Sequence, residues 1–544
     1  MKNEISKILK LLEVGNTDKA LQEVKVLHKL DKENLDIIKL LAYTYIQFGL
    51  FDKVILTLEE GYKDKPNAMD FDYYNNIGYS LMQIEDYERS INYLNNALEI
   101  NDKNPGTFST IATVYLRKRN FEKAQYFIDQ SVELIFRLGE KEYTKYTSVF
   151  LLKSEINSAL KKDDKTVELF INILNKKFNE NIFYLLTNIR PNVVNLELIR
   201  SAEENLKINN SLVNKIERFN FVTPIYFGLA NYYQLTERSK SEKFFDLGNE
   251  EIFKTSRYNS HQYQISILKS MDIFKNKFQS YNNENDQDGL GKNNIFIVGS
   301  PRSGTTLIES IVSANTKVFS GGELTSAKNI IDSFVRFPEK GISNLQENLN
   351  EKYLSRTSYL KGDFTYFIDK MPENFLFIGY LIKLLPKSRI IRVFRNPWDI
   401  AISLYKQRYI LNIPYSCSFF NIGIFLANFE AINLFWNKNL ENKKNILDIK
   451  YEELVENQAQ YQKKIYAFLD LDAEYNDKIR EGFFSPTASI RQVKGKIHNK
   501  SVNKTDFAHK KSEFLDSLQM QRQFWKSRGI TSKNDDFFGY SVEN

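Results

Sequence analysis

The sequence predicts a chain of two structural parts: an all-α solenoid of helical repeats, followed by an α/β domain with a mostly parallel sheet. Three observations lead to this prediction. The first half repeats with a period of 34 residues, a polar stretch follows at 282–294, and a strand, a glycine-rich turn and a helix are expected over 295–311. With 544 residues the chain is also too long for a single hydrophobic core.

The repeat is clearest over residues 1–135. Tyr74, Ile77, Gly78, Leu81, Tyr87, Ser90 and Ala97 return 34 residues later as Phe108, Ile111, Ala112, Tyr115, Phe121, Ala124 and Ser131. This order of aromatic, apolar and small positions resembles the tetratricopeptide repeat, a helix-turn-helix unit. We expect the small residues to let paired helices approach closely and the aromatic residues to fill the space between repeats.

The pattern weakens over 140–280 but stays helical, with amphipathic stretches at 147–160 and 166–174. Residues 227–249 resemble one more degenerate repeat. We therefore predict a solenoid over 1–281. Two interpretations of it stay open: a concave surface that grips a peptide or protein partner, or a scaffold that only supports the second domain, because repeat signatures are set by packing.

Residues 282–294 are polar and poor in apolar anchors, so we predict a linker there and a second domain over 295–544. The 75 basic and 68 acidic side chains nearly cancel, which gives no case for a nucleic-acid partner. The sequence shows neither an apolar run of about 20 residues nor the apolar core of a signal peptide, so we expect no membrane span and a cytoplasmic protein. The lone Cys417 agrees with a reducing compartment and is expected to be a small buried hydrophobe.

The stretch 295–311 is the chemical centre of the second domain. Its turn brings backbone N–H groups and a helix N-terminus to one point, which suits an anion such as a phosphate. The frame from Gly299 to Gly304 resembles a P-loop, but Thr305 stands where a nucleotide triphosphatase has lysine. A second strand at 389–394 ends in Arg395, where a Mg-dependent phosphotransferase would place an acidic metal ligand. The pattern therefore favours a second anionic group of the ligand over a metal ion.

Five motifs in order resemble those of the sulfotransferase family, in particular protein-tyrosine sulfotransferases and bacterial proteins that fuse such a domain to tetratricopeptide repeats. The motifs are Pro301-Arg-Ser-Gly-Thr-Thr-Leu, Gly322-Glu323, Asp369-Lys370-Met-Pro-Glu-Asn-Phe, Arg395-Asn-Pro-Trp-Asp-Ile-Ala-Ile-Ser403 and Lys450-Tyr451-Glu-Glu-Leu. The resemblance implies a P-loop-like sulfotransferase domain, the donor 3′-phosphoadenosine 5′-phosphosulfate (PAPS) as co-substrate, no metal, and transfer of a sulfuryl group to an acceptor hydroxyl.

The resemblance also implies which residues bind the donor. The positions that correspond to the 5′-phosphosulfate site are Arg302, Ser303, Gly304, Thr305 and Thr306. Arg395 and Ser403 correspond to contacts with the 3′-phosphate, and Tyr451 and Lys504 also fall on donor-binding positions. One departure stands out: the family branch has arginine where this chain has Gln407, with Lys406 and Arg408 beside it.

Three residues correspond to the family's catalytic groups. Glu323 matches the general base, which takes the proton of the attacking hydroxyl. Lys370 and Ser489 match the groups that steady oxygens of the donor as its S–O bond breaks. Without the resemblance, the residues favour an acidic residue at a helix start for Glu323, a solvated lysine for Lys370 and a structural loop serine for Ser489.

Several functions stay open at this point. The first is a sulfotransferase acting on protein tyrosine, and the same nucleophile is offered by sugars, lipids and small molecules. A non-catalytic tetratricopeptide adaptor with a nucleotide-binding loop is the alternative from another class. A P-loop kinase is disfavoured by Thr305 and by Arg395.

Overall fold

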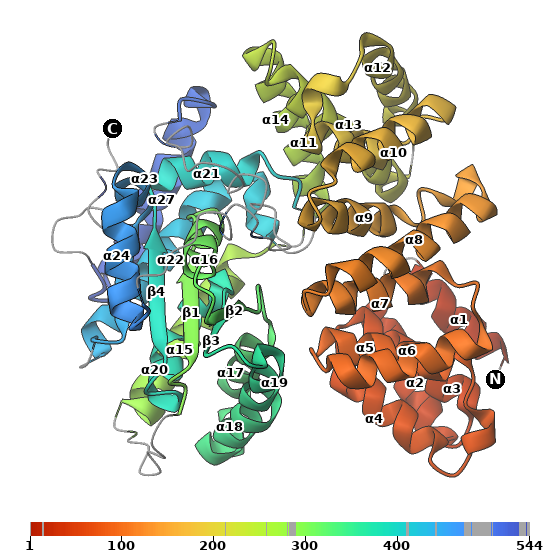
Figure 1. Cartoon of the computed structure of the whole chain (residues 1–544), viewed down its shortest axis with the longest axis horizontal. Helices are drawn as coiled ribbons and strands as arrows, with labels where there is room; N and C mark the ends of the chain where they lie inside the picture. The colour runs from red at the N-terminus through yellow and green to blue at the C-terminus, as the bar shows by residue number, and fades with distance from the viewer. Residues whose placement is uncertain are drawn as a thin grey trace. The chain divides into compact units, whose positions relative to one another are not determined.

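The computed structural model describes residues 2–13, 16–212, 214–256, 258–279, 281, 290–409, 413–440, 443–472, 480, 483, 502, 504–531 and 540. Its contacts divide the chain into two compact units, Met1–Lys161 and Lys162–Asn544. Figure 1 shows helices throughout the first unit and helices with a single sheet in the second. An all-helical region followed by a parallel sheet is the predicted fold class, which is thereby confirmed.

The first unit is built of antiparallel helix pairs. Its helices are α1 (Lys2–Glu13), α2 (Thr17–Leu30), α3 (Leu35–Gln47), α4 (Phe51–Tyr62), α5 (Phe71–Gln83), α6 (Tyr87–Ile100), α7 (Pro105–Arg117), α8 (Phe121–Leu138) and α9 (Thr147–Ala159). The predicted period is visible in the helix starts, since α7 and α8 each begin 34 residues after α5 and α6.

Small residues bring the paired helices α5 and α6 together, as the repeat predicts. A Cβ atom on Gly78 would lie 2.7 Å from Leu94 Cγ, so only glycine fits this crossing. Ser90 Oγ donates a 2.7 Å hydrogen bond to the Gly78 carbonyl and closes the pair. A similar serine contact occurs far along the chain, where Ser241 Oγ donates to the Ala230 carbonyl at 2.8 Å.

The second unit begins with a run of helices. They are α10 (Asp163–Lys176), α11 (Glu180–Ile189), α12 (Leu196–Asn210), α13 (Lys215–Tyr233), α14 (Arg238–Thr255) and α15 (Ser260–Ile273). The last of them share a core with the sheet domain: Phe274 packs edge-on against Trp436 at 5.0 Å, and Tyr380 Oη donates a 2.7 Å hydrogen bond to the Ser270 carbonyl. Compact packing therefore joins these helices to the sheet, upstream of the predicted linker. Residues 282–289 of that linker lie outside the described residues.

Five parallel strands form the sheet in the described part of the chain. They are β1 (Asn294–Gly299), β2 (Val318–Ser320), β3 (Tyr366–Asp369), β4 (Arg389–Phe394) and β5 (Ile446–Lys450), in the order β2-β3-β1-β4-β5. β1 lies at the centre, between β3 and β4. Its side chains alternate, with Phe296 in one hydrophobic cluster and Ile295 and Ile297 in the other. Both faces are thus covered, as is usual for parallel sheets.

The remaining helices cover the two faces and the strand ends. They are α16 (Thr305–Val312), α17 (Ser326–Arg336), α18 (Gly341–Leu349), α19 (Ser355–Lys361), α20 (Ile378–Leu384), α21 (Pro397–Tyr405), α22 (Phe419–Asn439), α23 (Tyr451–Glu456), α24 (Gln458–Leu469) and α27 (Lys511–Lys526). α22 is long and apolar enough to cross a membrane by composition, but 83% of its most apolar window is buried inside the protein. It is the core helix of this unit.

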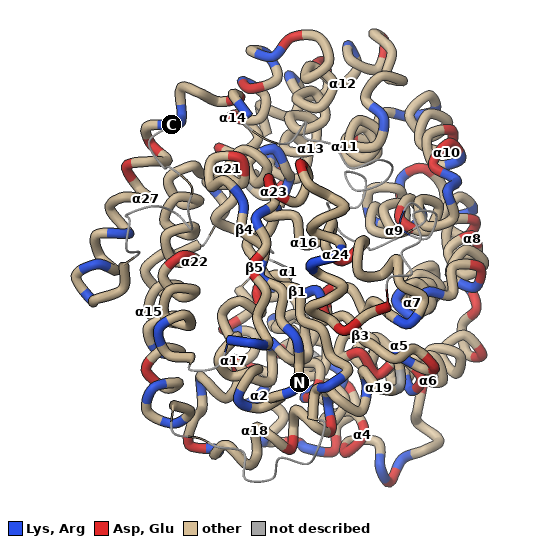
Figure 2. Tube along the Cα trace, turned by 60° about the vertical axis from the view of Figure 1, so that its left-hand side comes forward, with Lys and Arg blue, Asp and Glu red and all other residues tan. Residues whose placement is uncertain are grey.

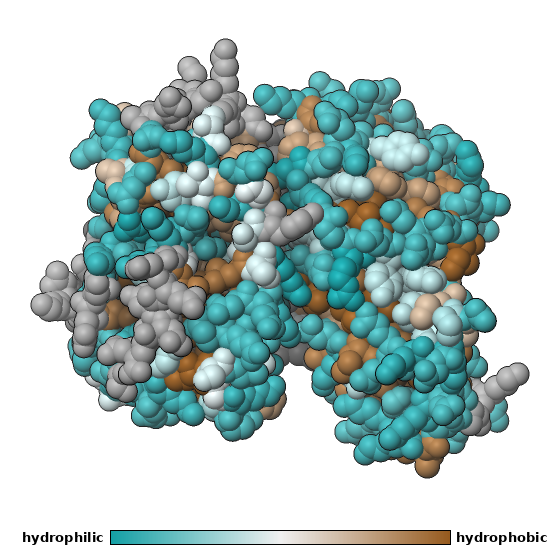
Figure 3. All heavy atoms as spheres, turned by 60° about the horizontal axis from the view of Figure 1, so that its bottom comes forward, coloured by the Kyte–Doolittle hydropathy of each residue, from teal (hydrophilic) through white to brown (hydrophobic). Residues whose placement is uncertain are grey.

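The surface is mixed in character. Figure 2 shows Lys and Arg interspersed with Asp and Glu along the helices, and the face in Figure 3 is mostly hydrophilic, with hydrophobic residues in small separate groups. Cys417 is buried, as expected, and burial raises the pKa of its thiol to about 11.

Candidate active site

The turn between β1 and α16 has the geometry of an anion loop. Arg302 and Gly304 both adopt a positive φ, 70° and 106°, which curls the backbone before the helix begins at Thr305. Two features require glycine at position 304: the positive φ, and a Cβ atom that would lie 2.4 Å from Tyr451 Cδ2. The N-terminus of α16, with Thr305 and Thr306, therefore opens on the loop, where its N–H groups and dipole favour an anion.

Buried cations gather beside this loop. Arg302 Nε donates a 2.9 Å hydrogen bond to Ser403 Oγ of α21, and Arg395 Nη1 donates one of 2.9 Å to the Arg302 carbonyl. The Arg395 guanidinium stacks on the Tyr451 ring at 4.4 Å. Arg302 and Arg395 are only 6% and 4% exposed. The structure thus brings together residues that the sequence assigned to donor binding from separate motifs.

Lys504 joins this cluster from the C-terminal part of the chain. Its backbone N–H donates a 2.8 Å hydrogen bond to Asp399 Oδ1 at the start of α21. Burial, followed by the charges of Arg395 and Arg302, lowers the pKa of Lys504 to about 7. Burial also lowers the pKa of Arg395. The cluster therefore holds more positive charge than its surroundings compensate, which favours a polyanionic ligand.

A second group of charges lies at the end of β3. Lys370, fully buried, pairs with the carboxylate of Glu323 and lies with its Nζ 3.7 Å from Glu309 Oε2 of α16. Glu309 is also fully buried and accepts a hydrogen bond from Ser320 Oγ, whereas the Glu323 side chain is 38% exposed. Glu323 is therefore the member of this group that an incoming molecule can reach.

Two glycines, Gly321 and Gly322, shape the backbone before Glu323. Gly321 N donates to the Ile368 carbonyl and Lys370 N to the Gly322 carbonyl, each at 2.8 Å. A Cβ atom on Gly321 would lie 2.4 Å from Phe367 Cζ, and Gly322 has a φ of +73°. This close approach to β3 holds Glu323 next to Lys370.

Tyr409 connects the two groups. Burial raises the pKa of its phenol, the Arg302 guanidinium lowers it, and the Glu323 carboxylate raises it. The phenol therefore lies within electrostatic reach of both a donor-site cation and the predicted base. Glu309 supplies the geometric link, because it lies on α16, the helix that begins at the anion loop, and is 3.7 Å from Lys370 Nζ.

The two residues that flank Gln407, Lys406 and Arg408, make different contacts. Lys406 lies 3.0 Å from Asp506 Oδ1 and is among the charges that lower the pKa of Lys504. Arg408 instead stacks on Tyr184 of α11 at 5.4 Å. Lys406 is thus the neighbour that faces the cation cluster.

One predicted residue lies outside this description and two site residues were missed. Ser489 lies outside the described residues. Sequence reasoning missed Glu309 and Tyr409; the signal for Glu309 was a carboxylate in the middle of an otherwise uncharged, fully buried helix. In the described part of the chain, no group of three or more His, Cys, Asp or Glu side chains is arranged to hold a metal ion.

Comparison with known proteins identifies two regions. Residues 294–477 match the sulfotransferase family and residues 71–104 match the tetratricopeptide repeat. An uncharacterized protein of Aquifex aeolicus (strain VF5) is 25% identical over 338 residues, which make up 57% of this chain and 43% of that protein. The chain therefore matches less than half of that relative's length.

Solved structures show similar, weaker likenesses. The sulfotransferase domain of the Synechococcus PCC 7002 olefin synthase aligns at 19% identity and a TM-score of 0.28, covering 44% of this chain and 96% of that domain. A thermophilic tetratricopeptide-repeat protein of Thermus thermophilus aligns at 16% identity and a TM-score of 0.28, covering 32% of this chain and 91% of that protein. At these scores the likenesses carry no argument of their own.

Proposed function

We propose that this chain, a fusion of tetratricopeptide repeats with a sulfotransferase-family domain, transfers a sulfuryl group from PAPS to an acceptor hydroxyl. One observation carries the proposal: the cations of Arg302, Arg395 and Lys504 lie together beside the anion loop, and Arg302 and Arg395 are almost fully buried there. The helix that begins at this loop, α16, also carries Glu309, which contacts Lys370. Such a cluster supports binding of a ligand with several phosphate or sulfate groups.

The residues present fit the two anionic ends of PAPS. The loop from Arg302 to Thr306 would hold the 5′-phosphosulfate with backbone N–H groups, hydroxyls and a guanidinium. Arg395, Ser403 and Lys504 would hold the 3′-phosphate, with Lys406 beside them in place of the arginine that Gln407 replaces. When bound, PAPS would supply the sulfuryl group and a nucleotide leaving group.

Glu323 would act as the general base. Its partly exposed carboxylate would accept the proton of the acceptor hydroxyl, so that the oxygen attacks as its O–H bond breaks. A base of this kind typically contributes about 10²–10⁴-fold to the rate.

The Lys370–Glu309 contact supports this role. If Glu323 takes up a proton, it loses the charge that neutralises Lys370 in the resting site. Glu309 lies 3.7 Å away and is fully buried, so the Lys370 ammonium would keep a counter-ion throughout. Lys370 is then able to leave Glu323 and donate to an oxygen of the donor without becoming an unpaired buried charge.

The acceptor is the finer part of the proposal. Protein tyrosine is the first class to test, on the resemblance to protein-tyrosine sulfotransferases, and the repeats would then grip the acceptor protein. Sugars, lipids and small phenols offer the same hydroxyl and belong in the same acceptor screen.

The test is transfer from sulfate-labelled PAPS in the absence of Mg²⁺, with the Glu323→Ala variant alongside. Labelled acceptor with wild type and at least ~100-fold less with the variant would support the proposal. Nucleotide binding by both proteins without any transfer across the acceptor screen would favour the adaptor instead.

A further inference from the structure

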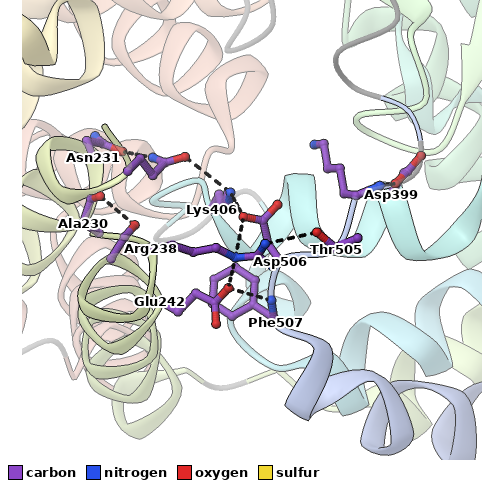
Figure 4. Close-up of polar contacts among 12 residues, drawn as sticks. Ala230, Asn231, Arg238, Glu242, Asp399, Lys406, Thr505, Asp506 and Phe507 are labelled. Atoms are coloured by element: carbon purple, nitrogen blue, oxygen red, sulfur yellow. Dashed lines mark hydrogen bonds and ion pairs between the residues drawn. The ribbon is translucent and has the colours of Figure 1, made fainter. Parts of the chain in front are cut away.

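A short segment, 504–507, ties the cation cluster to a helix far away in the sequence. On one side, Arg238 of α14 donates from Nη1 to Thr505 Oγ1 at 3.1 Å, and its Nε lies 3.8 Å from Asp506 Oδ1. Glu242, one turn along α14, accepts a 3.0 Å hydrogen bond from Phe507 N. The same carboxylate oxygen, Oε1, accepts a 2.9 Å hydrogen bond from Arg238 Nε. Figure 4 shows Arg238 of α14, Asp506 and Lys406, which follows α21, close together.

The other side of the same segment contacts α21. Lys406 Nζ lies 3.0 Å from Asp506 Oδ1, and Lys504 N donates to Asp399 Oδ1 at 2.8 Å. Asp506 thus lies between two cations, Arg238 of α14 and Lys406 at the end of α21. Burial alone would raise the pKa of its carboxyl, but Lys406 and Arg238 lower it below its ordinary value.

Phe507 anchors the end of the segment. It is fully buried, with ring centroids 6.1 Å from Phe245 of α14 and 5.2 Å from Tyr405 of α21. Its φ of +56° is a left-handed conformation that a bulky residue adopts only where its surroundings impose it. The anchor and the ion pairs therefore fix the backbone two or three residues from Lys504.

α14 also holds the end of α21. Asn249 Nδ2 donates a 2.9 Å hydrogen bond to the Tyr405 carbonyl, and Tyr405 Oη donates one of 2.7 Å to Asp246 Oδ1. Ser403 lies two residues before Tyr405 on this helix. Two of the three proposed 3′-phosphate contacts, Lys504 and Ser403, are thus close in sequence to residues that α14 contacts.

We propose that Arg238 and Glu242 of α14 are positioning residues that hold Lys504 beside Arg395 and Arg302 for a nucleotide 3′-phosphate. Both residues lie outside the region 294–477 that matches the sulfotransferase family. The proposal rests on the proposed function for the identity of the nucleotide. A helix of the degenerate-repeat region would then be part of the donor site.

The physical reason is conformational entropy. A lysine side chain that must be ordered on binding loses several rotatable bonds, and a loose backbone adds to that loss. The ion pairs of Asp506 and the hydrogen bond to Glu242 fix the backbone before the nucleotide arrives. Releasing them should weaken binding by about tenfold, which corresponds to about 1.4 kcal/mol.

The test is calorimetric binding of two probes, adenosine 3′,5′-bisphosphate and adenosine 5′-phosphate, to the full chain. Arg238→Gln should bind the bisphosphate about tenfold more weakly and leave the affinity for the monophosphate unchanged, since only the former carries a 3′-phosphate. Arg190→Gln, which removes an exposed ion pair with Asp164 in the same unit, is the matched control and should bind both probes as wild type does.

A double-mutant cycle shows whether Arg238 acts through Lys504. Arg238→Gln added to Lys504→Met should cause no loss beyond that of Lys504→Met alone. Equal weakening of both probes, additive losses in the cycle, or an unchanged bisphosphate affinity would each overturn the positioning role. If wild type binds neither probe, the donor assignment itself fails, and the positioning role falls with it.

Discussion

The low pKa of Lys504 makes nucleotide binding depend on pH in a defined direction. The pKa of Lys504 is about 7, against an ordinary value of 10.5, because the side chain is buried and because Arg395, Arg302 and Lys406 face it, with Asp399 as the opposing charge. A bound phosphate favours the ammonium form and raises this pKa again. Above pH 7 the protein must therefore take up a proton in order to bind.

The magnitude follows from linkage. If the bound pKa returns towards its ordinary value, affinity is highest below pH 7 and falls about tenfold per pH unit above it, so binding at pH 9 is about 100-fold weaker than at the acid plateau. At pH 8 about 0.9 proton is taken up per nucleotide. The phosphates themselves contribute little between pH 7 and 9, because their second pKa is about 6 and the ionisation is about nine-tenths complete at pH 7.

Calorimetry of adenosine 3′,5′-bisphosphate in two buffers of different ionisation enthalpy measures both quantities. Lys504→Met is the control: it should bind more weakly than wild type at pH 7 and lose most of the dependence between pH 7 and 9. A wild-type affinity that stays constant over this range, or a Lys504→Met variant with the same slope as wild type, would refute the reasoning.

Three further substitutions test separate parts of the site. Arg395→Ala removes a buried cation that donates a hydrogen bond to the Arg302 carbonyl and stacks on Tyr451. Nucleotide binding should therefore weaken by about 1.5–3 kcal/mol. Unchanged affinity in a titration would exclude Arg395 from the donor site. Gly304→Ala should weaken nucleotide binding because its Cβ atom would lie 2.4 Å from Tyr451. Gly341→Ala is the control: Gly341 has a comparable φ of +81° but open space around it, so this change should lower only the stability of the fold. Equal nucleotide affinities for the two variants would contradict the steric account. Glu309→Gln leaves the packing nearly unchanged but removes a counter-ion of Lys370, so turnover should fall while nucleotide affinity stays at the wild-type value. Weaker nucleotide binding in calorimetry with unchanged turnover would show instead that Glu309 contributes to donor binding.

Local pattern was sufficient to predict much of this fold. The predicted 34-residue period equals the spacing between the starts of α5 and α7 and of α6 and α8, because small and aromatic positions in a solenoid are dictated by nearest-neighbour packing. The apolar run at 389–394 coincides with β4. In both cases the signal lies within a few residues of the feature it predicts.

The contacts that complete the site escaped prediction because they join distant segments. Arg238 meets Thr505 across 267 positions of the chain, and no periodicity links the two. Glu309 is a carboxylate on a buried helix, and only the fold shows that Lys370 lies beside it. The electrostatic interaction of Tyr409 with Arg302 likewise joins residues that are far apart in the sequence.

The central claim is that Glu323 accepts the proton of an acceptor hydroxyl in a site that holds PAPS through a separate cation cluster. The most direct test measures two quantities on the same preparations of wild type and Glu323→Ala: transfer from sulfate-labelled PAPS and affinity for adenosine 3′,5′-bisphosphate. We predict at least ~100-fold less transfer by the variant at an unchanged nucleotide affinity. Equal transfer by the two proteins would contradict the account.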